Sequence, residues 1–240
     1  MSPTSNLAAS GLPARLTGML LRPRATLQAA IAAGAGAVAV TWLTILAVWL
    51  ASGAWLLTQP VGRQAVVDEQ VRVIEALGGR VDDASYRAWQ ASPPWRTYFT
   101  SGGRALLLPI TTVLVAAGLF LFARRHAPGV RYLAALSVAV HASVVLAAQQ
   151  VVATPVHALR ESLTSPFNLA ALLPFFDEGS LPARVLGTVE LFGLWWAVLL
   201  ALGAAALTGR RARTYVGPVV GGYVGVAAVV AGIVVLMGGS

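Results

Sequence analysis

The stretch VLGTVELFGLWWAVLLALGAAAL, residues 185–207, decides the fold of this chain. About 20 consecutive apolar residues cross a membrane as a helix, and this stretch carries a single ionisable residue, Glu190. The polar, proline-containing segment SPFNL, residues 165–169, and a short amphipathic run to Leu181 precede it. We therefore predict a membrane span here, and we expect the other helices to pack around it.

The composition is that of an integral membrane protein. The 240-residue chain is 57% hydrophobic and 11% charged, whereas a soluble domain carries about 25% charged residues. The chain has no cysteine, which excludes disulfides and thiolate metal sites. The net charge of +8 does not indicate nucleic-acid binding, because the arginines flank apolar runs as they do around membrane spans. Every basic residue is arginine and Ala, Gly and Val are abundant, as in GC-rich bacterial genomes, so we expect a bacterial plasma membrane.

Five segments have the length and hydropathy of membrane spans. They are residues 35–57, 105–122, 132–152, 185–207 and 216–237. Short joints connect the second span to the third and the fourth to the fifth, so each pair is expected to run antiparallel. The predicted fold class is an all-α polytopic bundle of five transmembrane helices with short amphipathic helices at the interface.

Arginines near the span ends set the predicted orientation. One side carries short, dense clusters, namely Arg22, Arg24, Arg124, Arg125, Arg131, Arg210, Arg211 and Arg213. The other side carries Arg63, Arg104, Arg160 and Arg184, with Arg72, Arg80, Arg87 and Arg96 further out in a long loop. We expect the denser side to face the cytoplasm, which places the N-terminus inside and the C-terminus outside.

The predicted domain organisation is one membrane domain, residues 23–238, behind a cytoplasmic segment, residues 1–22. An apolar stripe in that segment is typical of a helix lying in the membrane interface, and Pro23 is expected to end it. The stripe consists of Leu12, Leu16, Met19 and Leu20.

Residues 59–103 form the first predicted outside loop. Apolar residues at helical spacing predict an amphipathic helix that ends at Gly78–Gly79; they are Val67, Val71, Ile74 and Leu77. The aromatic residues that follow are typical of a membrane-interface belt, and they are Trp89, Trp95, Tyr98 and Phe99. Two interpretations stay open, an interfacial cap over the bundle and a surface that docks a partner.

Residues 153–184 form the second predicted outside loop, which we interpret either as a structural lid or as a partner-binding one. Asn168 or Ser165 can cap a short helix with Pro166 in its first turn. The expected apolar face of this helix is Leu169, Leu172, Leu173 and Phe176, and the expected end is Pro174 with Asp177–Glu178–Gly179.

Ionisable residues inside a membrane are functional candidates because they are costly there. Glu190 is expected about five residues into the fourth span, at the depth of Gln149 and Gln150 in the third, and these residues predict a polar cluster. The cluster would be a hydrogen-bond clamp, a proton relay or ligand site, or a carboxylate exposed at the interface. His141, near the middle of the third span, is either a satisfied core residue or a second relay group. The histidines have no metal-ligand spacing, and no cofactor motif is present.

Gly217, Gly221 and Gly225 recur every four residues in the fifth span. Such a face lets helix backbones approach closely, either inside the monomer or between two copies. Pro218 is expected in the first turn of this helix.

Three short motifs resemble the Yip1-domain family. They are Arg22–Pro23–Arg24–Ala25–Thr26 before the first span, Ser165–Pro166–Phe167–Asn168–Leu169 before the fourth, and Glu190 with Phe192 and Trp195 in the order of that family's acidic residue, Phe and Trp. The resemblance covers about residues 20–238 and implies five spans with the N-terminus inside. Eukaryotic relatives act with small GTPases in vesicle traffic, a role that is not carried over to a bacterial chain. Glu190 replaces the more usual Asp.

These features predict a non-enzymatic membrane protein that acts through protein or lipid contacts, as a scaffold or accessory subunit of an assembly such as an exporter. The expected partners are the lipid bilayer and another membrane protein or a second copy of the chain. The alternative is a small channel or proton-coupled transporter that uses Glu190 and His141.

Overall fold

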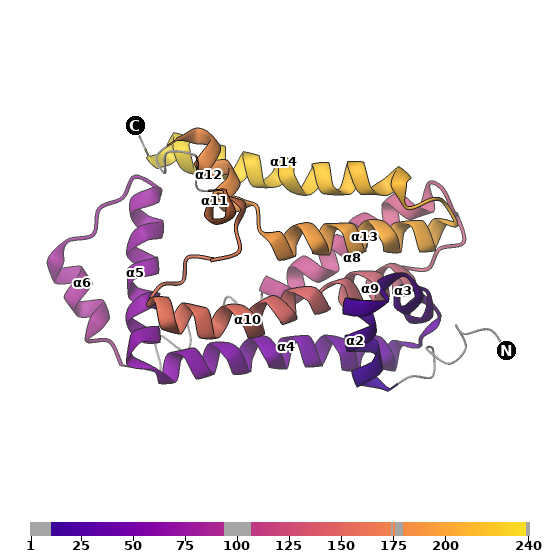
Figure 1. Ribbon diagram of the computed structural model, residues 1–240, viewed down its shortest axis with the longest axis horizontal. Coiled ribbons are helices and arrows are strands. Elements are labelled where there is room, and N and C mark those ends of the chain that lie inside the picture. The colour runs from indigo at the N-terminus through magenta and orange to yellow at the C-terminus, as the bar shows by residue number, and fades with distance from the viewer. Residues whose placement is uncertain (1–10, 94–106, 174, 176–179, 239–240) are drawn as a thin grey trace. The chain divides into compact units, whose positions relative to one another are not determined.

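The computed structural model describes residues 11–93, 107–173, 175 and 180–238, and every regular element in these ranges is a helix (Figure 1). The helices are α2 (Leu12–Leu21), α3 (Pro23–Ala32), α4 (Ala35–Thr58), α5 (Pro60–Ala76), α6 (Asp83–Gln90), α8 (Leu107–Arg124), α9 (Tyr132–Ala142), α10 (Val144–Arg160), α11 (Leu169–Leu172), α12 (Leu181–Thr188), α13 (Leu191–Thr208) and α14 (Arg213–Gly238). The all-α prediction is confirmed. Five helical segments are long and apolar enough to cross a membrane, so the chain is a multi-pass membrane protein.

The chain divides into two compact units, each described here by itself. Unit 1 comprises Met1–Trp49, Leu106–Gln149 and Phe192–Tyr223, and unit 2 comprises Leu50–Ala105, Gln150–Leu191 and Val224–Ser240. Several predictions fall outside the described residues: the aromatic residues Trp95, Tyr98 and Phe99, the first two residues of the second span, and the lid residues Pro174, Phe176 and Asp177–Glu178–Gly179.

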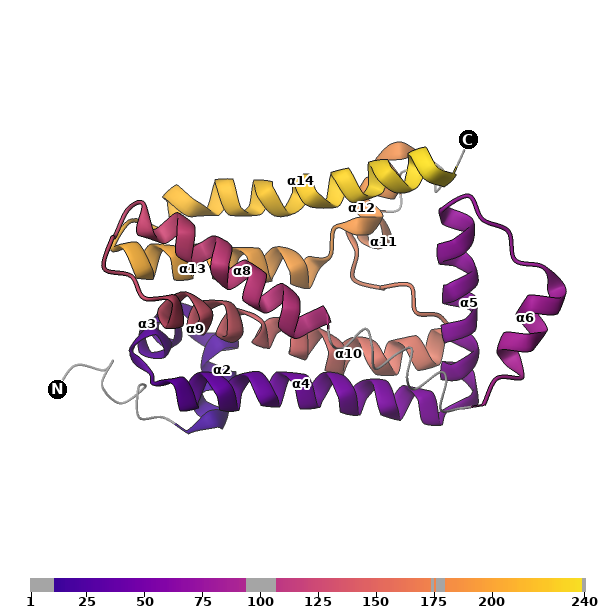
Figure 2. The same cartoon turned by 180° about the vertical axis from the view of Figure 1, so that it is seen from behind.

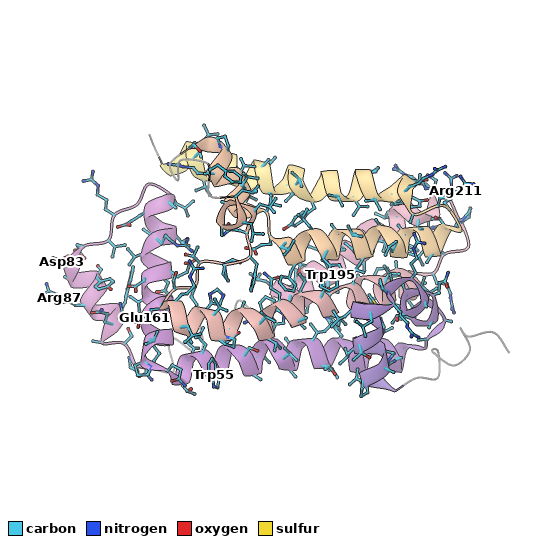
Figure 3. The ribbon with its side chains drawn as sticks, in the orientation of Figure 1. Trp55, Asp83, Arg87, Glu161, Trp195 and Arg211 are labelled. Atoms are coloured by element: carbon cyan, nitrogen blue, oxygen red, sulfur yellow. The ribbon has the colours of Figure 1, made fainter. Side chains whose placement is uncertain are left out.

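Helix α9 is the centre of unit 1, with α3 and α8 packed against it. Its small side chains allow neighbouring helices to approach closely, and 61% of the residues in the apolar window of the third span are buried, against 44% in that of the fourth. Within unit 1 the helices therefore pack around α9 of the third span rather than around the fourth span. The bulky Trp195 of that span is partly exposed instead (Figure 3).

The third span is longer than predicted and is interrupted once. Helix α10 continues to Arg160, whereas the sequence placed the end at residue 152, and Ser143 separates α9 from α10. Pro155 lies inside α10 without ending it. The first eight residues of the predicted lid are therefore helical.

The N-terminal helices belong to the core of unit 1. The first helix ends at Leu21, just before Pro23 as expected. Pro23 then begins α3 at its first position, where a missing backbone N–H costs nothing. Met19 of α2 and Leu27 of α3 are fully buried. Ser137 Oγ on α9 donates to Ala30 O at 2.6 Å, which ties α3 to the central helix.

Unit 2 contains the helices α5 and α6, which lie side by side in both views (Figures 1 and 2). A helix is found in the loop after residue 59, as predicted, but it begins at Pro60, well before Val67. Of the predicted apolar stripe, Val67 is buried, whereas Leu77 lies just beyond the helix and is exposed. Gly78 follows it with φ of +81°, as a helix C-terminus requires. Helix α6 was not predicted; Asp82 caps it by accepting from Ser85 N at 2.8 Å.

Candidate functional site

Residues 165–168 dock on the chain just before the fourth span. An isolated antiparallel bridge pairs Asn168 with Glu190. Two backbone hydrogen bonds flank the bridge, from Leu169 N to Val189 O and from Leu191 N to Phe167 O, both at 2.9 Å. They satisfy backbone groups at the interruption between α12 and α13, which an apolar environment makes necessary.

Side chains reinforce this bridge. Ser165 Oγ donates to Glu190 Oε2 at 2.7 Å and accepts from Phe167 N at 3.2 Å. Asn168 is 7% exposed; its amide nitrogen donates to Ser165 O at 2.8 Å and its Oδ1 accepts from Ala171 N at 2.7 Å. We refer to Ser165, Asn168 and Glu190 as the clasp.

The sequence led us to expect Glu190 inside a continuous helix, but the helix is interrupted there. Helix α12 ends at Thr188, and α13 begins at Leu191. The β-branched pair Thr188 and Val189 has low helix propensity, and the bridge offers this backbone other partners. The carboxylate therefore stands just before the apolar span rather than one and a half turns within it.

The predicted helix entry is correct for Asn168, which is the N-cap of α11. It is wrong for Pro166, which lies in the turn before that helix and not in its first turn. Phe192 and Trp195 are neighbours on α13, with tilted rings whose centroids lie 6.2 Å apart. At the end of α12, Thr188 Oγ1 donates to Ala227 O of α14 at 3.2 Å.

The predicted cluster of Glu190 with the glutamines stays a prediction. Gln150 Nε2 donates to Thr154 Oγ1 at 3.3 Å, one turn along α10. Gln149 and His141 belong to unit 1, whereas Gln150 and Glu190 belong to unit 2.

His141 is a fully buried, hydrogen-bonded residue of unit 1. Its Nδ1 lies 2.8 Å from Ser137 O, so this nitrogen carries the proton and donates. Its Nε2 lies 3.5 Å from Thr41 Oγ1 of α4. These contacts link α9 to α4 and favour the core interpretation over a relay group.

The glycines of the fifth span do not make the close approach inside the monomer that the sequence favoured. Gly217, Gly221 and Gly225 are exposed, and a Cβ added to any of them would meet no atom within 4 Å. Helix α14 begins at Arg213, so Pro218 lies in its second turn, not its first. Among the membrane-span glycines that do pack closely are Gly193, against Tyr223, and Gly203, against Val138.

The facing sides of α5 and α6 share a polar network. Gln64 Nε2 donates to Tyr86 OH at 2.6 Å and to Asp68 Oδ1 at 2.9 Å, and Tyr86 OH donates to Asp68 at 2.7 Å. The hydrogen bond to Asp68 raises the pKa of Tyr86, because a phenolate would face a carboxylate. Beside the network lies a pocket of about 310 Å³, lined by residues that include Arg63, Gln64 and Trp89.

Comparison with known proteins identifies no relative: no family model, no curated protein and no solved structure matches this chain. The clasp is chemically a set of satisfied hydrogen bonds that joins a loop to the start of a span. These hydrogen bonds fix the position of the backbone at the start of the span.

Proposed function

We propose that this chain is a non-enzymatic membrane protein of the Yip1 type that acts through protein and lipid contacts. It would be a scaffold or accessory subunit of an assembly, such as an exporter, in a bacterial plasma membrane. Its N-terminus would face the cytoplasm.

The observation that carries this proposal is the exposed glycine face of α14, made by Gly217, Gly221 and Gly225. Only 11% of the residues in the apolar window of α14 are buried, so most of the helix surface faces outward. Small residues at every fourth position let a second helix approach the backbone, where dispersion contacts replace the missing driving force of water exclusion. The face is therefore suited to a helix from another membrane protein or from a second copy.

The alternative, a proton-coupled transporter, receives less support. Glu190 accepts a hydrogen bond from Ser165, and His141 is buried with a backbone partner. Neither residue lines the pocket beside Arg24, the pocket between α5 and α6, or the apolar pocket beside Trp42. A transport site needs polar groups that a substrate or water can reach.

A pull-down of the tagged protein in mild detergent, followed by mass spectrometry, tests the proposal. The variants are Gly221→Leu on the exposed face and Glu190→Leu in the clasp. Gly118→Leu is the matched control, because Gly118 is also exposed, on α8, with no atom within 4 Å of an added Cβ.

A membrane partner or second copy recovered with the parent and with Gly118→Leu, but lost with Gly221→Leu, is the expected result. Loss with Glu190→Leu as well would extend the interface to the clasp. Recovery of the single chain alone from the parent and from every variant would contradict the proposal and direct attention to flux measurements in reconstituted vesicles.

A further inference from the structure

A pocket of about 400 Å³ lies in unit 1 where α3 begins and where α13 connects to α14. Arg24 and Gln28 line it from α3, one helical turn apart, and Arg210 and Arg211 line it from the connection, where Figure 3 labels Arg211. The apolar part of the lining is Leu202, Ala205 and Ala206 of α13. A polar rim over an apolar wall matches a ligand that is itself amphipathic.

The charge of unit 1 has one sign. It contains nine of the 17 arginines and none of the nine Asp and Glu residues, which all belong to unit 2. The guanidinium groups of Arg24, Arg210 and Arg211 therefore have no carboxylate in their own unit, and all three side chains are exposed. Three cations around one pocket create a positive potential that attracts an external anion.

The α13–α14 connection is held in a fixed shape. Gly209 follows α13 with φ of +69°, a conformation that favours glycine. Thr208 Oγ1 donates to Ala204 O at 2.8 Å, so Tyr215 OH donates to Thr208 at 2.9 Å, and Tyr215 is 2% exposed. The arginines thus project from a braced turn, which lowers the entropy lost on binding.

We propose that this pocket binds the headgroup of an anionic phospholipid. Arg24, Arg210 and Arg211 would contact the phosphate, since guanidinium groups donate paired hydrogen bonds to phosphate oxygens. The glycerol and the first part of an acyl chain would lie against Leu202 and Ala206. Pockets of this kind at the basic ends of membrane helices suit anionic lipids. This proposal specifies which lipids the proposed function would involve. It rests on the proposed function only in that the protein lies in a membrane, and it does not depend on the glycine face of α14.

Native mass spectrometry of the full-length protein tests the proposal. The protein is exchanged into nanodiscs of phosphatidylglycerol and phosphatidylcholine, released into mild detergent, and the lipids that stay bound are identified. We expect phosphatidylglycerol to be retained in preference to phosphatidylcholine. In Arg210→Gln/Arg211→Gln the affinity should fall at least about tenfold, since the loss of even one charge-assisted contact has an effect of that size.

The matched control is Arg125→Gln/Arg131→Gln, which removes two exposed charges of the same unit from outside the pocket lining. It should retain the lipid as the parent does. An equal loss of bound phosphatidylglycerol in both double variants would overturn the proposal, because the lipid would then be held by general attraction between basic helix ends and an anionic surface.

A second variant tests the pocket without changing its charge. Ala206→Phe adds a ring to the apolar wall and should displace the lipid while thermal unfolding shows that the protein stays folded. Unchanged lipid retention in a folded Ala206→Phe variant would overturn the proposal. So would displacement of phosphatidylglycerol by inorganic phosphate alone, because the site would then prefer a soluble anion. The same spectra record whether a protein partner is present, so failure here is separate from failure of the assembly proposal.

Discussion

Glu161 is the one non-glycine residue with positive φ among the described residues, at +54°, and it directly follows α10 (Figure 3). Ser162 N donates to His157 O at 3.2 Å, the pattern of a helix C-terminus in which glycine usually takes the left-handed position. Glu161→Gly should therefore raise the free energy of unfolding by up to about 1 kcal/mol, because the strain of a side chain in this conformation is removed. Thermal unfolding in detergent measures the change.

Glu75→Gly is the matched control, in which the change in stability should have the opposite sign. Glu75 lies inside α5 with ordinary helical backbone, so glycine there should lower stability by about 1 kcal/mol. A loss of stability in Glu161→Gly as large as that in Glu75→Gly would show that the left-handed conformation carries no strain.

The clasp makes a second prediction at this scale. Glu190→Leu removes the acceptor for Ser165 Oγ, and Ser165→Ala removes the donor, so each should destabilise the protein by about 1 kcal/mol. The double variant should cost less than the two single variants together, because the shared hydrogen bond is lost only once. Glu190→Gln keeps an acceptor oxygen and should stay near the parent. Additive single effects in the unfolding series would mean that the bond contributes nothing.

The sequence identified the members of the clasp but not its contacts. Glu190 drew attention because a carboxylate beside an apolar run is costly, and Asn168 because it is a good cap residue. The bond to Ser165 depends on where α12 ends, and hydropathy does not register the weak helix propensity of two residues, Thr188 and Val189. The bridge between Asn168 and Glu190 forms in place of a continuous helix at these residues.

At the scale of the element, glycines on α13 and α14 should respond in opposite ways. Gly203→Ala places a Cβ against the side chain of Val138, a stiff β-branched residue, and should cost about 1–3 kcal/mol. Gly221→Ala meets no atom within 4 Å and should leave the monomer as stable or slightly more so. Thermal unfolding of the two variants in detergent measures both changes in stability. A destabilised Gly221→Ala monomer would contradict the conclusion that Gly221 lies on an exposed face.

The α5–α6 pair carries a pH-dependent contact. The pKa of Tyr86 is raised above the usual 10.0 by its bond to Asp68, so the contact is fully present below pH 10 and is lost as the pH rises through the folded-state pKa. Difference absorbance of the phenolate between the parent and Tyr86→Phe measures that pKa. In Asp68→Asn it should fall back toward the ordinary value. An unchanged pKa in Asp68→Asn would assign the shift to another cause.

Hydropathy predicted where each span has its centre, because the bilayer core sets the required length, and all five spans were found. The ends were less predictable. Pro155 and Pro218 lie inside helices although proline usually marks an end. In α14, the repeat of Gly217, Gly221 and Gly225 signalled packing but not whether the neighbour belongs to the same chain. Gly193 and Gly203 belong to no such repeat, although both pack closely against a neighbouring side chain.

At the scale of the whole molecule, charge divides as the two units do. All nine acidic residues belong to unit 2, together with eight arginines, whereas unit 1 is purely basic. The two sides of the membrane have nearly equal numbers of arginines, so arginine counts alone do not indicate the pocket. The positions of the acidic residues are the feature of the sequence that would have indicated a purely basic region. Orientation still follows arginine density near the span ends, because acidic residues contribute little to it.

The predicted orientation can be tested directly, because the chain has no cysteine to interfere with labelling. Ala84→Cys lies on exposed α6, and Gly129→Cys lies in the exposed turn between α8 and α9, where an added Cβ meets no atom within 4 Å. A membrane-impermeant maleimide added to intact cells should label Ala84→Cys alone, and lysis should make Gly129→Cys reactive as well. The reason is the dense arginine group around the α8–α9 turn, which favours retention on the cytoplasmic side. The reverse pattern would mean that the topology is inverted and that the pocket of Arg24, Arg210 and Arg211 faces the outer leaflet. Labelling of both variants in intact cells would mean that both positions are accessible from outside, which contradicts the predicted topology.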